Sequence, residues 1–226
     1  MYLSKMKIGN YEIKPVSIFL PDEKSRLDEY EKAKIYFAEQ RIEDILWVKG
    51  IHAHKFGVQG RHIYLLDNRP EEQFYFGDAN VGCYLSMYMI YNMMNVMDYS
   101  HYLFLEPDCV FVDGWKEKLE EALADIPSDF DFLFPGSCCA EDKQSVHVKG
   151  NLYHFPYRGE EMWRYYPQCG HCLLIAKKCL PHLIATNRDV ASPIDISLIR
   201  HSFGALNIYA ILPRIASQGT KTDLPK

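Results

Sequence analysis

Short apolar runs of the β type alternate along this chain with segments in which apolar residues recur at helical spacing. The first run, residues 16–20, stops at Pro21, and Asp22 is placed to cap a helix. Four apolar residues then share one helical face: Leu27, Tyr30, Ala33 and Phe37. Because strands that alternate with helices form a sheet covered by helices, the pattern restricts the chain to the α/β class with a mainly parallel central sheet.

The same alternation continues through the rest of the chain. Further strands are predicted at residues 45–48, 62–66, 102–105, 130–134, 173–176 and 208–212. Helices are predicted over about 80–97, over 115–126, over about 177–186 and from Pro193. Residues 136–168 are predicted to form an irregular loop rich in aromatic side chains. With 226 residues, 48% of them hydrophobic, a single domain can bury a core that depends on neither disulfides nor a structural metal.

The charge of the chain argues against a nucleic-acid partner. The formal net charge is −5 at pH 7, whereas neutralising phosphates along a nucleic acid requires a basic face. Acidic side chains outnumber basic ones in residues 76–160, and the reverse holds in residues 161–226. This asymmetry suits a site that holds a cation and a phosphate together, and it equally suits solvated faces of a folded domain.

Cysteine usage and hydropathy favour a cytoplasmic chain with reduced thiols. The seven cysteines are an odd number, and no basic, apolar leader precedes the fold. Cys138 and Cys139 are expected to be small apolar residues that follow a strand. The most apolar stretch, residues 81–97, is interrupted by polar residues and is shorter than the ~20 residues of a membrane span, so no span is expected.

Two carboxylates follow the most strand-like run of the chain. Residues 102–105 stop at Glu106-Pro107-Asp108, where the proline ends the regular ladder. Open α/β sheets bind ligands at the carboxyl ends of their strands. Glu106 and Asp108 supply the hard oxygen ligands that Mg²⁺ or Mn²⁺ prefers, with water and a diphosphate completing the shell. A solvated acidic turn is the alternative interpretation.

The sequence Cys169-Gly170-His171-Cys172 is a competing signal, since C-G-H-C is also a disulfide-exchange motif. Too few residues follow it to complete a thioredoxin-like unit, which argues against redox catalysis. A zinc site is the other alternative, although its spacing matches no known zinc signature. That site would combine Cys169 and Cys172 with residues drawn from Cys138, Cys139, His147 and His154.

The predicted aromatic loop allows two interpretations. Its rings suit stacking against the C–H faces of sugars, and they equally suit ordinary packing of a long loop. The residues concerned are Tyr153, Phe155, Tyr157, Trp163, Tyr165 and Tyr166.

The order and spacing of several short segments resemble a GT-A-fold glycosyltransferase, and are most similar to family 25, the sugar transferases of lipopolysaccharide and collagen glycans. The segment at 105–110, LEPDCV, resembles the metal turn of that family, and the segment at 80–86, NVGCYLS, resembles a helix start. The remaining matches are residues 18–20 with Arg26, residues 48–50, 170–178 and 193–195, and Pro213 with Gln218. The resemblance therefore spans about residues 16–219.

The resemblance implies a single glycosyltransferase domain that transfers a sugar, with inversion, from a nucleotide sugar to a hydroxyl of a glycan or glycoconjugate. The nucleotide-sugar-binding part is expected at about 14–112 and the acceptor-side part at about 113–219. A UDP-sugar is the expected donor. The expected acceptors are lipopolysaccharide, capsule and protein-linked glycans, including those of a viral coat.

The resemblance also implies roles for individual residues. Asp108 with Glu106 is expected to hold Mn²⁺ or Mg²⁺ on the donor diphosphate, and Asp195 is the candidate base for the acceptor hydroxyl. The expected donor-binding residues are Pro21, Arg26, Asp78, Glu106, His171 and Gln218. Structural alternatives remain for four residues. These are a helix-start carboxylate at Asp195, a solvated side chain at Arg26, an N-cap at Asp78 and a structural imidazole at His171.

Three residues depart from the family pattern: Asn80, Met87 and Pro107. They stand where the family has a glutamate, a histidine and an aspartate, respectively. The proline in the metal turn motivates an alternative, a catalytically silent glycosyltransferase-like module that binds glycans or partners. A nucleotidyltransferase is a further alternative. It is disfavoured because no glycine-rich, lysine-bearing phosphate loop follows the first strand.

Overall fold

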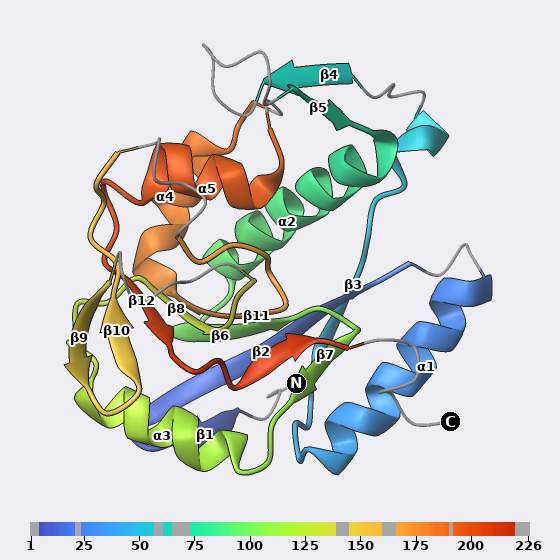
Figure 1. Ribbon diagram of the computed structural model, residues 1–226. Helices are drawn as coiled ribbons and strands as arrows, with labels where there is room; N and C mark the ends of the chain where they lie inside the picture. The colour runs from blue at the N-terminus through green and yellow to red at the C-terminus, as the bar shows by residue number, and fades with distance from the viewer. Residues whose placement is uncertain are drawn as a thin grey trace.

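A twisted sheet lies between two layers of helices in the computed structural model (Figure 1). The structure describes residues 5–20, 24–56, 61–64, 73–138, 145–159, 166–189 and 192–219. Helices α1 and α3 cover one face of the sheet, and α2, α4 and α5 cover the other. This arrangement confirms the α/β class predicted from the alternating pattern.

The main sheet has the order β1-β2-β6-β11-β8-β12-β10-β9, and β3 pairs with the same edge of β2 as β1. Five of the six strands from β3 to β12 point the same way, and β11 is antiparallel to both of its neighbours. Its strands are β1 (Met6–Ile8), β2 (Tyr11–Phe19), β3 (Leu46–Lys49), β6 (His101–Leu105), β8 (Phe132–Gly136), β9 (Val146–Lys149), β10 (Leu152–His154), β11 (Cys172–Ala176) and β12 (Ile208–Ile211).

Two smaller sheets accompany the main one. Strand β7 (Cys109–Phe111) pairs with β13 (Ala216–Gln218), and β4 (Arg61–Tyr64) pairs with β5 (Gln73–Phe76). The run predicted at 62–66 therefore belongs, in its described part, to a separate hairpin and not to the main sheet.

The helices follow the predicted segments closely. They are α1 (Lys24–Glu39), α2 (Asp78–Val96), α3 (Trp115–Asp125), α4 (Leu180–Thr186) and α5 (Ile194–Ser202), with 3₁₀ turns η1 (Ala53–Phe56) and η5 (Lys177–Cys179). On the predicted face of α1, Ala33 and Phe37 are buried, whereas Leu27 is 38% exposed. Leu27 lies in the first turns of α1, before the helix reaches the core residues that Ala33 and Phe37 contact.

Strand β6 is buried on both faces because its side chains alternate between the two helix layers. Leu103 and Leu105 pack with α1 and α3, and Tyr102 and Phe104 pack with α2, α4 and α5. Such alternation over a continuously apolar run is typical of a central strand. The strand therefore fixes where its carboxyl end, and the turn that follows, lies in the molecule.

The prediction of an irregular loop over residues 136–168 is wrong in part, because β9 and β10 form a hairpin within it. All four residues of β9 are exposed, so the alternation of apolar and polar residues in its sequence, VHVK, does not mark a face that is buried in the core. The hairpin joins the sheet edge through β10, which pairs with β12.

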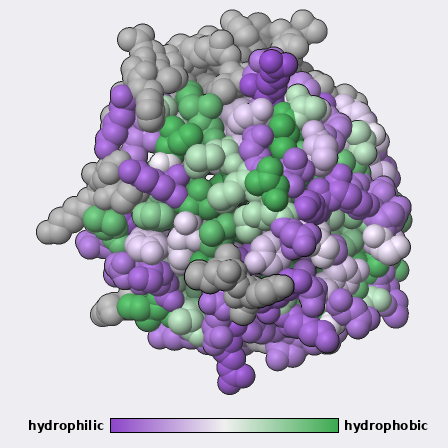
Figure 2. Space-filling model, turned by 180° about the vertical axis from the view of Figure 1, so that it is seen from behind, coloured by the Kyte–Doolittle hydropathy of each residue, from purple (hydrophilic) through white to green (hydrophobic). Residues whose placement is uncertain are grey.

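In the described part of the chain, no helix is long and apolar enough to cross a membrane. The face shown in Figure 2 mixes hydrophilic and hydrophobic residues, with hydrophobic side chains gathered near its middle.

Gly82, in the second turn of α2, allows the helix to lie against the segment after β3. A Cβ at this position would lie 2.6 Å from the carbonyl oxygen of Ile51, a backbone atom that a side-chain rotation cannot move. We expect Gly82→Ala to lower the free energy of unfolding by about 1–3 kcal/mol, as overpacking does, in urea denaturation. Gly204→Ala is the matched control, because its Cβ would meet nothing nearer than 3.5 Å. Equal stability of the two variants would contradict this account of the packing.

Candidate functional site

The turn after β6 projects two carboxylates from the carboxyl end of the sheet. The backbone N–H of Glu106 donates to the carbonyl of His171 at 2.9 Å, which extends the β6–β11 pairing by one residue. The N–H of Cys109 donates to the carbonyl of Glu106 at 3.0 Å and closes the turn around Pro107. Since β2, β3 and β6 are parallel, their carboxyl ends meet at this edge. The turn therefore stands where open α/β sheets bind ligands.

A cavity of about 580 Å³ lies beside this turn, and we call it the α1 cavity. It is bounded by the end of β2, the first turns of α1 and α2, the segment after β3 and the turn after β6. Its polar side chains are Arg26, Glu29, His52, Asp78, Ser86, Glu106, Asp108 and Gln218. Its volume falls in the range of roughly 300–1,000 Å³ that small-molecule sites occupy.

A second cavity, of about 460 Å³, lies between α2, α5 and the ends of β6 and β11, and we call it the α5 cavity. Most of its wall is apolar, with side chains that include Met87, Phe104 and Leu198. Its polar side chains are Asn80, Glu106, His171, Asp195 and Gln218. An apolar wall with a few polar groups is the usual composition of a ligand site.

The two cavities meet at Cys83, Glu106 and Gln218, each of which lines both of them. The Cys83 thiol is surrounded by protein on most sides yet open to solvent through the cleft. This burial raises the pKa of Cys83 to about 12, with smaller contributions from the charges of Glu106 and Asp195.

Glu106 is held by His171, which β11 carries beside it. Oε2 of Glu106 lies 2.8 Å from Nδ1 of His171. The imidazole is buried, with 4% of the residue exposed, whereas the Glu106 side chain is 29% exposed. The contact fixes one carboxylate oxygen and leaves the remainder of the group facing the cleft.

Asp108 is held by hydrogen bonds from Gln218 and Gly219, the last residues of the chain that the structure describes. Nε2 of Gln218 donates to Oδ2 of Asp108 at 2.9 Å, and the N–H of Gly219 donates to its carbonyl at 2.7 Å. Strand β13 positions Gln218 by pairing with β7, the strand that directly follows the turn. Two residues that are 110 positions apart are thereby brought into contact.

Asp195 lies in the first turn of α5 and faces the α5 cavity. Its Oδ1 accepts from the N–H of Ile196 at 2.9 Å, and its Oδ2 accepts from the N–H of Cys169 at 3.3 Å. The second hydrogen bond ties the carboxylate to the loop that carries His171. Two backbone donors thus fix the orientation of Asp195 at the cavity wall.

The remaining predicted site residues lie on the α1 side. Arg26 lines the α1 cavity and forms an ion pair with Glu29, one turn along α1, at 2.7 Å. Asp78 is the first residue of α2 and lines the same cavity, while Gly77 occupies the N-cap. The predicted N-cap role of Asp78 is therefore wrong. Pro21 lies outside the described residues.

The structure also corrects the expectation for two cysteines. Cys138 is exposed and forms a disulfide with Cys169, with their Cα atoms 5.8 Å apart, so it is neither reduced nor a small apolar residue of the core. Cys172 is a free, buried thiol in β11, which confirms that the C-G-H-C sequence is not a redox pair. The sequence does not reveal this bond, because disulfide connectivity cannot be deduced from cysteine positions in one sequence.

Two aromatic residues of the predicted loop are buried and pack in the protein core. Phe155 and Tyr166 are fully buried, and Tyr166 contacts Phe203 with ring centroids 5.0 Å apart. Trp163 and Tyr165 lie outside the described residues. Neither Phe155 nor Tyr166 is therefore exposed for stacking on a sugar.

No protein-family model and no curated protein sequence matches the chain. Among solved structures, it is similar to a glycosyltransferase involved in the glycosylation of the major capsid of PBCV-1, with 10% identity, a TM-score of 0.52, and coverage of 93% of this chain and 95% of that one. It is also similar to the inositol-1-phosphate CTP transferase of T. maritima, with 10% identity, a TM-score of 0.45, and coverage of 94% and 91%. A third similar structure is A197 from STIV, with 13% identity, a TM-score of 0.42, and coverage of 88% and 81%.

The likeness to the PBCV-1 structure shows a shared fold over nearly the whole of both chains. The chain therefore has a glycosyltransferase-like α/β fold. The narrower resemblance to family 25 stays a prediction.

The raised pKa of Cys83 predicts that its thiol is alkylated slowly at neutral pH. Only the thiolate is nucleophilic, so a pKa of about 12 instead of the ordinary ~8.5 should slow alkylation at neutral pH on the order of 10³-fold. The measurement is the iodoacetamide rate at Cys83 between pH 7 and 11, followed by peptide mass spectrometry in EDTA-containing buffer. A model cysteine peptide is the control. A rate that levels off near pH 8.5 would show that the cleft does not enclose the thiol as described.

Proposed function

We propose that this chain is a glycosyltransferase, which moves the sugar of a nucleotide-sugar donor to a hydroxyl group of a glycan or glycoconjugate. The observation that carries the proposal is the meeting of two cavities at Glu106 and Gln218, at the carboxyl end of β6. A transfer between two substrates requires both to be held with their reacting atoms in line. The two cavities share a wall of polar groups, so one cavity can hold the donor and the other the acceptor.

The α1 cavity suits the donor nucleotide. Arg26 lies at one side of it, where a guanidinium is suited to pairing with phosphate or stacking on a base. Asp78 offers a carboxylate to ribose or sugar hydroxyls. A UDP-sugar remains our expected donor, on the basis of the family resemblance.

The residues of the turn after β6 fit a hard divalent cation. Among the described residues, hydrogen bonds engage one oxygen of each carboxylate, Oε2 of Glu106 and Oδ2 of Asp108, which leaves the other oxygen of each for coordination. Carboxylate oxygens are the ligands that Mg²⁺ and Mn²⁺ prefer. A cation held by Glu106 and Asp108 would neutralise charge on the departing diphosphate. Gln218 keeps Asp108 oriented toward that position.

The α5 cavity suits the acceptor, and Asp195 is its base. The carboxylate lies at the wall of this cavity, where it can accept the proton of the attacking hydroxyl. Its two backbone donors hold it still, so little reorientation is needed when the acceptor arrives. The mostly apolar wall around it can pack against the C–H faces of a sugar.

One observation favours the alternative of a catalytically silent module. His171 engages one oxygen of Glu106 at 2.8 Å, and Pro107 stands where the resembling family has a further acidic residue. Both features reduce the ligands available to a cation. Such a module would bind glycans or a partner without turnover.

Donor binding tests the assignment of the α1 cavity. We expect calorimetry with UDP-, GDP-, CMP- and TDP-sugars to show micromolar binding of one nucleotide class, strengthened by Mn²⁺. Asp108→Asn should weaken the Mn²⁺-dependent binding at least about tenfold, since a contact to a charged group is worth ~1.5–3 kcal/mol. The exposed Asp113, which lines neither cavity, provides the control variant Asp113→Asn. Absence of binding by every nucleotide sugar would contradict the donor site.

Turnover tests the role of Asp195. Asp195→Asn keeps the size of the side chain and removes the base, so we expect kcat to fall on the order of 10²–10⁴-fold while donor affinity is unchanged. Asp189→Asn, at an exposed residue outside both cavities, is the control. Full activity of Asp195→Asn would remove this residue from the reaction. Donor binding without transfer to any acceptor by the unmodified chain would favour the silent module.

A further inference from the structure

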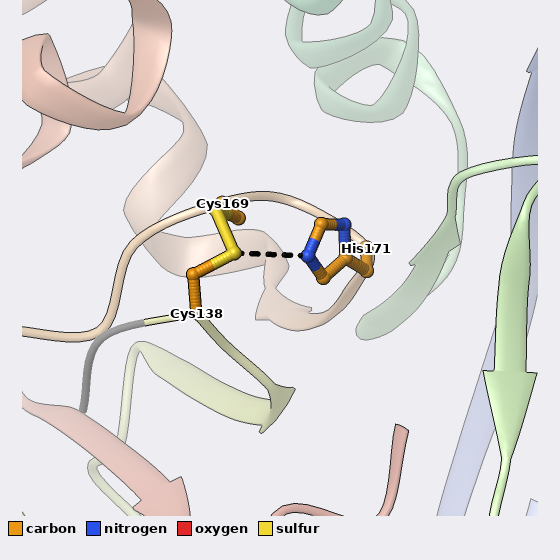
Figure 3. Close-up of side chains that lie close together, drawn as sticks. All are labelled: Cys138, Cys169 and His171. Atoms are coloured by element: carbon orange, nitrogen blue, oxygen red, sulfur yellow. Dashed lines mark hydrogen bonds between the residues drawn. A yellow bond between two sulfur atoms is a disulfide. The ribbon is translucent and has the colours of Figure 1, made fainter. Parts of the chain in front are cut away.

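Three metal-ligating side chains converge beside the α5 cavity, which Cys169 and His171 line. Cys138 follows β8, whereas Cys169 and His171 lie in the loop that leads into β11 (Figure 3). The two sulfur atoms and one ring nitrogen of His171 all lie within 4.8 Å of one another. A metal site needs at least three His, Cys, Asp or Glu side chains close together. Among the residues that the structure describes, only these three form a group compact enough to hold a metal.

We propose that Cys138, Cys169 and His171 bind a thiophilic divalent cation, with Zn²⁺ the best fit, when the disulfide is reduced. Two thiolates and an imidazole are the donor set that zinc selects, whereas Mg²⁺ and Mn²⁺ prefer oxygen. Three protein ligands leave the fourth tetrahedral position to water or another ligand. The site is distinct in chemistry from the carboxylate pair of the turn after β6.

The hydrogen bonds of His171 support this assignment. Nδ1 contacts Glu106, a carboxylate that can only accept, so Nδ1 carries a proton. Nε2 points at the sulfur of Cys138 from 3.1 Å, and a disulfide sulfur has no hydrogen to donate. With the disulfide intact, Nε2 therefore faces a sulfur atom that offers it no proton. With a metal bound, the neutral ring gives its Nε2 lone pair to the cation and keeps both contacts.

Glu106 then acts as the outer partner of the metal-binding histidine. Histidines that bind metals usually donate their other N–H to a carboxylate or carbonyl, which fixes the ring and its tautomer. The 2.8 Å contact between Nδ1 and Oε2 is this arrangement, already in place. Because Glu106 also lines both cavities, occupancy of the site would act on the cleft through this carboxylate.

Only side chains need to move to open the site. Two sulfurs on one tetrahedral zinc lie about 3.8 Å apart, given Zn–S bonds of about 2.3 Å. Cys138 is exposed and can rotate outward once the disulfide is reduced. The two loops stay together without the disulfide, because the N–H of Cys138 donates to the carbonyl of Gln168 at 3.0 Å. The N–H of Glu106 likewise holds the carbonyl of His171.

Cobalt titration of the reduced chain tests the proposal. We expect one equivalent of Co²⁺ to produce the visible bands of tetrahedral cobalt and a near-ultraviolet sulfur-to-cobalt band, and one equivalent of Zn²⁺ to abolish both. Glu106→Gln should weaken binding about 10–100-fold, as outer-shell substitutions do. Cys138→Ser, Cys169→Ser and His171→Ala should weaken it further. Cys83→Ser, at a free thiol outside the cluster, is the matched control.

Three outcomes would overturn the proposal. One is reduced thiols at positions 138 and 169 with no cobalt spectrum, which would leave a redox pair only. Another is a disulfide that the folded chain does not release to reductant, which would make it a permanent bond. The third is binding that the cysteine variants do not change.

X-ray absorption at the zinc edge can be measured on the unmodified chain, so this test does not depend on the folding of any variant. We expect two sulfur ligands and one imidazole, and a shell of oxygen and nitrogen alone would contradict the site.

Discussion

Burial of β6 on both faces is the constraint on which the site depends. Four consecutive side chains, residues 102–105, are almost completely buried, and the strand pairs with β2 on one side and β11 on the other. A strand held this firmly ends at a defined point, and the proline at position 107 ends its ladder there. Glu106 and Asp108 thus extend from a strand that is buried on both faces and paired on both edges, the kind of support that a site needs for its polar groups.

The reversed direction of β11 brings the second half of the chain to the same point. Because β11 runs antiparallel to β6, its first residue lies opposite the last residue of β6, and His171 reaches Glu106. Strand β13 completes the convergence by crossing β8 so closely that a Cβ on Gly136 would lie 2.6 Å from the carbonyl oxygen of Ala216. Gln218 then meets Asp108. The ends of β6, β11 and β13, which are distant in sequence, meet at one cleft in this way.

The elements with strong apolar patterns were predictable from the sequence. The helix predicted over 115–126 is confirmed as α3, in which Trp115, Leu119 and Ala122 are buried, and β6, β11 and β12 fall where their apolar runs indicated. Short strands are the hardest to predict: the three residues of β13 carry too little pattern, and the alternating sequence of β9, VHVK, spans only four residues, none of them buried. Tertiary pairing, and not local preference, makes these segments strands.

The candidate site was likewise predictable where a residue carries a local sequence signal, and not where it depends on contacts across the fold. The turn at Glu106-Pro107-Asp108 stands out in the sequence because carboxylates follow a buried run. Contacts across the fold have no such local signal. The pairing of Cys138 with Cys169 and the contact of His171 with both Glu106 and Cys138 required the structure. The polar groups were visible one by one, and their arrangement came from the sheet order.

The central claim is that the two cavities form one donor and acceptor site around Glu106. Crystals soaked with Mn²⁺ and, in turn, with UDP, GDP, CDP and TDP would test this claim most directly. We expect one nucleotide to occupy the α1 cavity with its diphosphate against the turn that carries Asp108. Density for a nucleotide at another surface, or for none of the four at this turn, would contradict the account.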